Sequence, residues 1–262
     1  MDIQSISSDL KSRLSSARHI LVGLGEEWQI RSGQETGKQE QILQAYDVLY
    51  QLLKDKDYFI VTMATDARIY TTRLGSTTER VTVAEPQEEP AFSCTADPET
   101  LARMDRIFPP VQRLADVRER RIVAPCGNET WRQCSRACTK DIWEPGEIPE
   151  DICPHCGAPL TGNTMEADTY IEEGYLPQWN HFTQWLSGTW NQDLLILELG
   201  VGFQNPSVIR FPFEKTAYVN QKSHLVRVHQ KLPQVTSELA GRADSIRQNS
   251  VEWILGNSSR VI

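Results

Sequence analysis

Apolar residues along this chain recur in two patterns, one typical of amphipathic helices and one typical of strands covered on both faces. A spacing of three and four residues predicts helices at residues 7–19, 38–56, 178–190 and 243–254. Short, mostly apolar runs predict strands at residues 20–22, 58–65, 194–200 and 224–230, the last of these being the final strand. Because the strands are continuously apolar and alternate with helices, the pattern predicts an α/β fold with a Rossmann-like parallel sheet.

Two segments interrupt this alternation. Residues 75–100 are rich in Thr, Glu and Pro and predict a mobile loop. Residues 126–160 contain most of the cysteines and predict a small inserted zinc-ribbon module. The large nucleotide-binding domain is therefore expected to be discontinuous, formed by residues 1–125 and 161–262.

Composition excludes several classes of protein. The formal net charge is −8 and no run of Lys or Arg forms a basic stripe, so a nucleic-acid partner is not expected. No apolar run approaches the roughly 18 residues of a membrane span, and the N-terminus lacks the apolar core of a signal peptide. These features predict a cytoplasmic protein with no membrane partner, in which six cysteines serve as metal ligands or thiols rather than disulfides.

Four cysteines have the spacing of two zinc knuckles. Cys134 and Cys138 form one pair, Cys153 and Cys156 form the other, and 14 residues separate the pairs. Each tight turn offers two thiolates, and four thiolates close a tetrahedral shell with no open position. We therefore expect a structural zinc site at these cysteines, with His155 facing solvent.

Two predicted strands end in a Gly-x-Gly turn, Gly23-Leu24-Gly25 and Gly200-Val201-Gly202. Such turns at the carboxyl ends of parallel strands allow backbone amides to approach a phosphate. An ordinary tight turn is the alternative, because neither motif has the full G-x-G-x-x-G spacing. Glu26 and Glu27 follow the first turn, and a carboxylate aimed at a pyrophosphate would cost roughly 1–4 kcal/mol at 4 Å. A ribose hydroxyl or the positive end of a helix is the alternative partner for these carboxylates.

In this order the motifs resemble those of the sirtuins, a family of NAD-dependent deacylases and ADP-ribosyltransferases. Gly23-Leu24-Gly25 resembles the family's G-A-G turn, and Thr62-Met63-Ala64-Thr65-Asp66 stands where sirtuins have T-Q-N-x-D. Cys126-Gly127 stands where they have His-Gly. The stretch LELGVGFQNPSVIRFPFE is similar to a segment of the macrodomain-linked bacterial sirtuins, which are similar to ADP-ribosyltransferases rather than deacetylases.

The resemblance implies an NAD site between the two glycine turns and a protein substrate. The cofactor-binding residues that it implies are Gly23, Leu24, Gly25, Glu26, Asp66, Gly200, Val201, Gly202, Asn205 and His229. For His229, a strand-end histidine with its hydrogen bonds satisfied is the alternative interpretation.

The chain departs from the family where the chemistry would occur. Cys126 replaces the catalytic His and Ala64 replaces the paired Asn, so ordinary deacetylation is not expected. Asp66 is a candidate for stabilising positive charge on the reacting ribose. Cys126 is either a thiolate that acts as nucleophile or base, which requires a lowered pKa, or a small buried residue that fills the space of the missing imidazole.

Together these features predict an atypical NAD-dependent ADP-ribosyl or deacyl transferase, with ADP-ribosyl transfer favoured and Asp66 and Cys126 as its candidate catalytic residues. The alternative is a catalytically inactive sensor or scaffold that binds NAD or ADP-ribose, and the missing His and Asn favour it.

Overall fold

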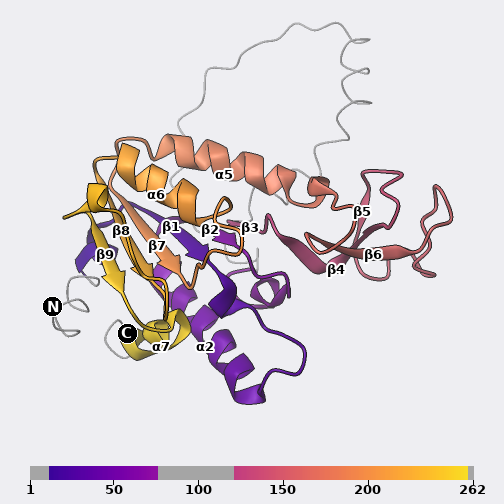
Figure 1. Ribbon diagram of the computed structural model, residues 1–262, viewed down its shortest axis with the longest axis horizontal. Helices are drawn as coiled ribbons and strands as arrows, with labels where there is room; N and C mark the ends of the chain where they lie inside the picture. The colour runs from indigo at the N-terminus through magenta and orange to yellow at the C-terminus, as the bar shows by residue number, and fades with distance from the viewer. Residues whose placement is uncertain (1–11, 76–120, 259–262) are drawn as a thin grey trace, which may run out of the picture.

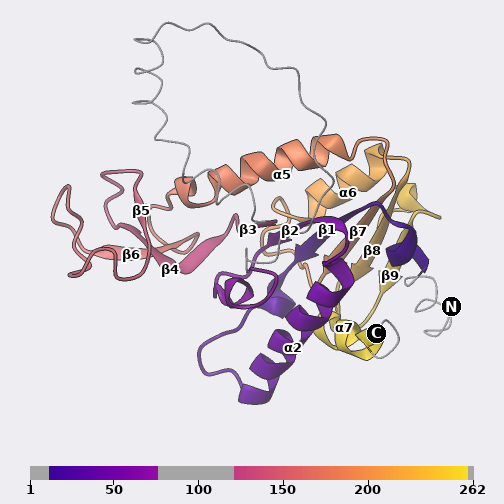
Figure 2. The ribbon, with the colours of Figure 1, turned by 180° about the vertical axis from the view of Figure 1, so that it is seen from behind.

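The computed structural model describes residues 12–75 and 121–258 (Figure 1). The loop predicted at residues 75–100 therefore lies outside the described residues from residue 76 onward. Within the described part of the chain, one large sheet is covered by helices on both faces, and a small antiparallel sheet projects from one end (Figures 1 and 2).

The large sheet has six strands in the order β3-β2-β1-β7-β8-β9, and every neighbouring pair is parallel. The strands are β1 (His19–Leu24), β2 (Asp57–Thr62), β3 (Ile122–Val123), β7 (Leu194–Leu199), β8 (Ser223–Val228) and β9 (Ala243–Ile246). After β1 the chain adds β2 and then β3 on one side of the sheet. After β7, which lies on the other side of β1, it adds β8 and then β9. The Rossmann-like parallel sheet predicted from the sequence is confirmed, and its order reverses between β1 and β7.

Four of the helices in the described part of the chain cover the two faces of this sheet. They are α2 (Thr36–Leu53), α5 (Leu176–Gly188), α6 (Arg210–Val219) and α7 (Ser250–Ser258), and short 3₁₀ turns occupy Glu26–Trp28, Arg68–Thr71, Glu172–Gly174 and Ser237–Leu239. The helices α2 and α7 lie on one face, and α5 and α6 lie on the other (Figures 1 and 2). In β1, Ile20 and Val22 pack toward α2 and α7 while Leu21 packs toward α5 and α6, which explains the unbroken apolar run. None of the described helices combines the length and the apolar character needed to cross a membrane.

The carboxyl-terminal part of the sequence prediction is wrong in one respect. A helix was expected from residue 243, but Ala243–Ile246 forms β9, and α7 begins at Ser250. The strand pairs with β8 in parallel, and Asp244 bonds the imidazole of His224 at 2.7 Å across that pair. This cross-strand contact is invisible to local periodicity.

The inserted module is a three-stranded antiparallel sheet in the order β5-β4-β6. Its strands are β4 (Gly127–Cys134), β5 (Ile142–Trp143) and β6 (Leu160–Thr164). The pairing of β6 with β4 continues to Thr164, beyond the boundary expected at residue 160. Because β4 follows β3 directly, the module begins at the carboxyl edge of the large sheet.

Candidate functional site

A cleft of about 430 Å³ opens at the carboxyl edge of the large sheet. Its walls come from the segments that follow four strands of that sheet, together with two residues after β6. The lining residues are Glu26, Gln29, Ile30, Arg31 and Ser32 after β1, Met63 and Thr65 after β2, Cys126 and Glu129 after β3, Gln204 and Asn205 after β7, and Met165 and Glu166 after β6. Of the predicted cofactor-binding residues, the cleft is lined by Glu26 and Asn205; of the predicted catalytic residues, it is lined by Cys126.

The two glycine turns pack back to back. A Cβ added to Gly25 would lie 2.2 Å from the carbonyl oxygen of Gly200 and 2.4 Å from Cα of Val201. Gly200 also has a φ of +66°, in the region that favours glycine. Gly25 is therefore explained by the close contact of one turn with the other, and Gly200 by its positive φ and by the side chain of Glu27, 2.6 Å from where its Cβ would lie, without reference to a ligand.

The remaining residues of the first turn and the middle residue of the second face the protein interior. A Cβ on Gly23 would lie 2.6 Å from Cγ2 of Ile209 in the segment before α6. Leu24 and Val201 are both fully buried, in the apolar layers on opposite faces of the sheet. None of these three residues lines the cleft, so the geometry does not support a direct contact between them and a nucleotide.

Backbone amides beside the turns are already bonded to carboxylates of the same chain. The amide of Gly202 donates to Oε2 of Glu26 at 2.6 Å. The amides of Gln230 and Ser250 donate to the two carboxylate oxygens of Glu27 at 3.0 and 2.6 Å. Because Ser250 begins α7, Glu27 neutralises the positive end of that helix, one of the partners anticipated for these carboxylates.

His229 has the role of a satisfied strand-end histidine. Its Nδ1 accepts hydrogen bonds from the amides of Lys231 and Leu232 at 3.0 and 3.1 Å, and it lies 3.6 Å from Oε1 of Glu27. Burial lowers the pKa of this imidazole, which favours the neutral ring that can accept both bonds. The residue is outside the cleft lining.

Asp66 joins two loops. Its carboxylate accepts hydrogen bonds from the amides of Ile30 and Arg68, and burial raises its pKa. Both oxygens are thereby used to hold the segment after β1 against the segment after β2. The carboxylate is outside the cleft lining, so the geometry gives Asp66 a positioning role.

Cys126 lies at the inner wall of the cleft with 4% of its surface exposed. It packs in the apolar layer beside Val61, Met63 and Phe182. Burial, with a smaller contribution from the negative charge of Glu26, raises the pKa of its thiol to about 11. A thiol that stays protonated at neutral pH is neither a base nor a nucleophile, so the space-filling interpretation is the better supported one.

A hydrogen-bonded group that the sequence interpretation missed joins three residues that line the cleft. The amide of Thr65 donates to Oε1 of Gln29 at 2.8 Å, and its hydroxyl donates to Oε1 of Glu129 at 2.7 Å. The amide of Glu129 in turn donates to the carbonyl of Thr65 at 2.8 Å. Gln29 and Thr65 shortly follow strands of the large sheet, which is the sequence signal that could have identified them, whereas Glu129 lies on β4.

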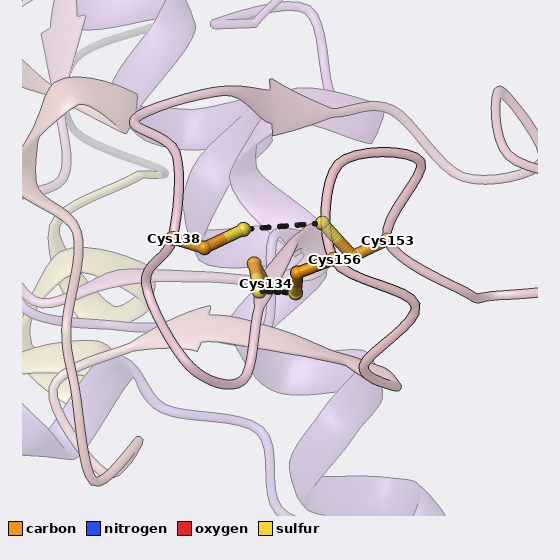
Figure 3. Close-up of side chains that lie close together, drawn as sticks. All are labelled: Cys134, Cys138, Cys153 and Cys156. Atoms are coloured by element: carbon orange, nitrogen blue, oxygen red, sulfur yellow. Dashed lines mark hydrogen bonds between the residues drawn. The ribbon is translucent and has the colours of Figure 1, made fainter.

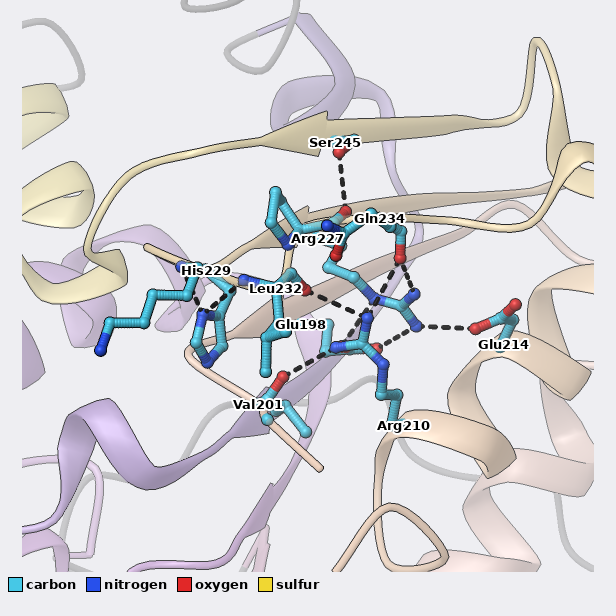
Figure 4. A network of polar contacts seen from close by, with 12 residues as sticks. Glu198, Val201, Arg210, Glu214, Arg227, His229, Leu232, Gln234 and Ser245 are labelled. Carbon is cyan, nitrogen blue, oxygen red and sulfur yellow. Dashed lines mark hydrogen bonds and ion pairs between the residues drawn. The ribbon is translucent and has the colours of Figure 1, made fainter. Parts of the chain in front are cut away.

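A buried ionic network supports the turn after β7 (Figure 4). Glu198, on β7, is fully buried and pairs with Arg227 through contacts of 2.7 and 2.9 Å. Arg210 lies 3.5 Å from the same carboxylate and donates to the carbonyls of Val201, Leu232 and Gln234. The network therefore fixes the backbone that carries the amide of Gly202.

The four cysteines of the module converge as their spacing predicts (Figure 3). Their sulfur atoms all lie within 4.8 Å of one another, with contacts of 3.6 Å between Cys134 and Cys156 and 3.5 Å between Cys138 and Cys153. Four sulfurs about 2.3 Å from a central zinc ion would be separated by slightly more, about 3.8 Å. This donor set could hold a tetrahedral metal ion.

His155 stays outside the cluster, as expected. It is half exposed, and its Nε2 lies 2.8 Å from a carboxylate oxygen of Asp141.

Backbone amides of Arg136 and Cys138 donate to the sulfur of Cys134, which favours the thiolate form of this cysteine.

Comparison with known proteins supports a sirtuin-like chain. No known family model matches the sequence. A protein ADP-ribosyltransferase of Staphylococcus aureus (strain Mu50 / ATCC 700699) is 23% identical over 92 residues, which cover 34% of this chain and 29% of that protein. The match thus spans less than a third of that relative's length. A solved structure from work on "The Structural basis for Sirtuin Substrate affinity" has a TM-score of 0.54 with 12% identity and full coverage of both chains. This confirms the sirtuin-like fold that the motifs suggested.

The cleft fits an NAD-type ligand in place and size but not in its anion-binding groups. It lies where the strand order reverses, and its volume falls in the usual range for ligand sites, about 300–1,000 Å³. The amide of Gly202, which a phosphate would need, is bonded to Glu26. As arranged, this turn does not offer that donor to a pyrophosphate.

Proposed function

We propose that this chain is an atypical sirtuin-like protein that binds an NAD-type nucleotide in the cleft and transfers its ADP-ribosyl group to a protein. The observation that carries the proposal is the position of the cleft at the carboxyl ends of β1, β2, β3 and β7, across the point where strand order reverses. Ligands of open parallel sheets bind in that crevice because the strand order leaves it unfilled.

ADP-ribosyl transfer is proposed in preference to deacetylation for two reasons. The relative from Staphylococcus aureus bears the name of that activity. In addition, the positions of the sirtuin base and its paired amide hold Cys126 and Ala64, which are both buried and cannot accept a proton at neutral pH. Asp66 is proposed to position the cleft loops, and Glu26 and Asn205 are the predicted cofactor-binding residues that line the cleft.

A catalytically silent nucleotide sensor is the second candidate. The observation that favours it is the protonated, buried thiol of Cys126 at the inner wall of the cleft. A sensor needs a ligand-binding cleft but no base, which agrees with both replacements at the catalytic positions.

We also propose a structural zinc ion at Cys134, Cys138, Cys153 and Cys156, because the donor set is closed and all four sulfurs are already gathered. A cytoplasmic location is proposed from the cysteine usage, since thiolate ligands persist where thiols stay reduced.

The decisive experiment is calorimetric titration of the purified chain with NAD and with ADP-ribose, together with measurement of nicotinamide release in the same samples. Binding with nicotinamide release and labelling of a protein by the ADP-ribosyl group supports the transferase. Binding without turnover supports the sensor. If neither NAD nor ADP-ribose binds to the wild type or to the Glu26→Ala variant, the nucleotide site itself is contradicted.

A further inference from the structure

We propose that Glu26 determines the affinity of this cleft for phosphate-bearing ligands, because its carboxylate occupies the anion position of the turn after β7. The inference rests on the proposed nucleotide site and concerns which ligands that site prefers. Ligands without phosphate bind with Glu26 in place. A diphosphate binds only when this carboxylate leaves the amide of Gly202.

The contact between Glu26 and Gly202 is close and specific. The amide hydrogen bond is 2.6 Å long, and a Cβ added to Gly202 would lie 3.0 Å from the other carboxylate oxygen. A backbone amide at a glycine turn that ends a parallel strand is the group that receives phosphate oxygens in such sheets. Here the carboxylate of Glu26 is the anion at that amide.

The two neighbouring carboxylates differ in how firmly they are held. Glu27 uses both oxygens, on the amides of Gln230 and Ser250. Glu26 uses one: its Oε2 accepts from Gly202, while its Oε1 is buried and has no hydrogen-bond partner among the described residues. A buried oxygen without a partner is energetically unfavourable, so the bound position of Glu26 is the weaker of the two. Glu27 is therefore a fixed cap of α7, and Glu26 is the displaceable group.

Charge makes the competition direct. None of the ion pairs among the described residues includes Glu26, and the nearby guanidinium of Arg210 is paired with Glu198. A phosphate brought to the same amide would face this carboxylate at hydrogen-bonding range, and the positive charge of Arg210, which acts on Glu26, is shared with Glu198 and Glu214. A ligand without phosphate, such as the uncharged nucleoside adenosine, meets no such repulsion.

The test compares ADP-ribose with adenosine by calorimetry on the wild type and on Glu26→Ala, Glu26→Gln and the control Glu166→Ala. Glu166 lines the same cleft, so its removal measures the general effect of losing one negative charge. We expect Glu26→Ala to bind ADP-ribose at least about tenfold more tightly than the wild type. Glu26→Gln should give a smaller gain because its amide oxygen still accepts from Gly202. The adenosine affinity of the Glu26 variants and the ADP-ribose affinity of Glu166→Ala should each change less than about threefold.

The outcomes separate this inference from the proposed function. Equal ADP-ribose affinity in the wild type and both Glu26 variants overturns the inference while the nucleotide site stands. An equal gain in Glu166→Ala also overturns it, because general charge would then explain the effect. Failure of every variant to bind either ligand overturns both. Unfolding temperature and zinc content serve as folding controls, and the nearly isosteric Glu26→Gln preserves the test should Glu26→Ala fold poorly.

Discussion

The cysteine cluster and the cleft show two ways in which a chain can use convergent polar groups. In the cluster, four side chains from two turns point at a common centre (Figure 3). At the glycine turns beside the cleft, the side chains of Glu26 and Glu27 point at backbone amides and satisfy them. The first arrangement could be completed by a metal ion from outside, whereas the second is already completed by the protein. A motif therefore locates donor groups without showing whether they are free.

The two regions also differ in what stabilises them. The module has a core cluster of four buried residues, Cys134, Trp143, Cys153 and Ala158, two of which are metal-ligand candidates. The edge of the large sheet rests on two extensive apolar layers and on the buried pair of Glu198 and Arg227. We therefore expect metal loss to affect one region and loss of the ion pair to affect the other.

The largest expected effect is that of Cys153→Ser on the module. Removing one of four thiolates should reduce the zinc content from about one ion per chain to a small fraction of that. In such sites zinc binding, with a free energy of about 10–16 kcal/mol, is coupled to folding and needs all the ligands. Metal analysis of the purified protein measures the loss, and hydrogen exchange should show faster exchange in β4, β5 and β6. The control Cys126→Ser should retain zinc, since Cys126 lies outside the cluster. Full zinc content in Cys153→Ser would contradict the site.

The next largest effect is that of Glu198→Ala on the large domain. This change leaves Arg227, 1% exposed, without its main partner, and we expect the free energy of unfolding to fall by about 3–5 kcal/mol. Denaturant unfolding measures it. The matched control is Glu214→Ala, which removes a partly exposed partner of the same arginine and should cost about 1 kcal/mol or less. Equal losses in both variants would show that the buried pair does not support this edge of the sheet.

The difference between local and tertiary information explains how much could be predicted from the sequence. Mostly apolar runs predicted the four longest parallel strands, because burial on both faces leaves a composition signal. Cysteine spacing predicted the cluster, because both members of each pair lie in one turn. The strand β9 was missed, since its pairing partner β8 and the contact of Asp244 with His224 lie outside any local window.

The site was predicted less completely than the fold, for a physical reason. The glycines of both turns were read as a way for amides to approach phosphate, but Gly25 is required by contact between the turns, and Gly200 by its positive φ and the nearby side chain of Glu27. The amides bonded to Glu26 and Glu27, those of Gly202 and Ser250, lie 176 and 223 residues away in sequence. Such long-range bonds follow from the fold and leave no local pattern.

Asp66→Ala should have an intermediate effect and would sharpen the role of the cleft loops. The change leaves the amides of Ile30 and Arg68 without their acceptor, which should destabilise the protein by about 1–3 kcal/mol. Thermal unfolding measures the loss, and Asp66→Asn, which retains one acceptor oxygen, should lose less. Nicotinamide release that vanishes in Asp66→Asn at unchanged stability would assign the carboxylate to chemistry instead of positioning.

The smallest expected effect is that of Cys126→Ala, and it decides whether this residue acts or only fills space. Removal of one buried sulfur should cost about 1 kcal/mol in stability, and nucleotide affinity should change less than about twofold. Because burial raises the thiol pKa to about 11, alkylation of wild-type Cys126 by iodoacetamide at pH 8 should be far slower than that of an ordinary exposed cysteine. Peptide mapping of the alkylated protein measures this rate for Cys126 separately from the other five cysteines. Rapid alkylation, together with loss of nicotinamide release in Cys126→Ala, would make the thiol a reactive group. The cleft would then resemble the cysteine cluster, with a thiol available to react with or bind a ligand from outside.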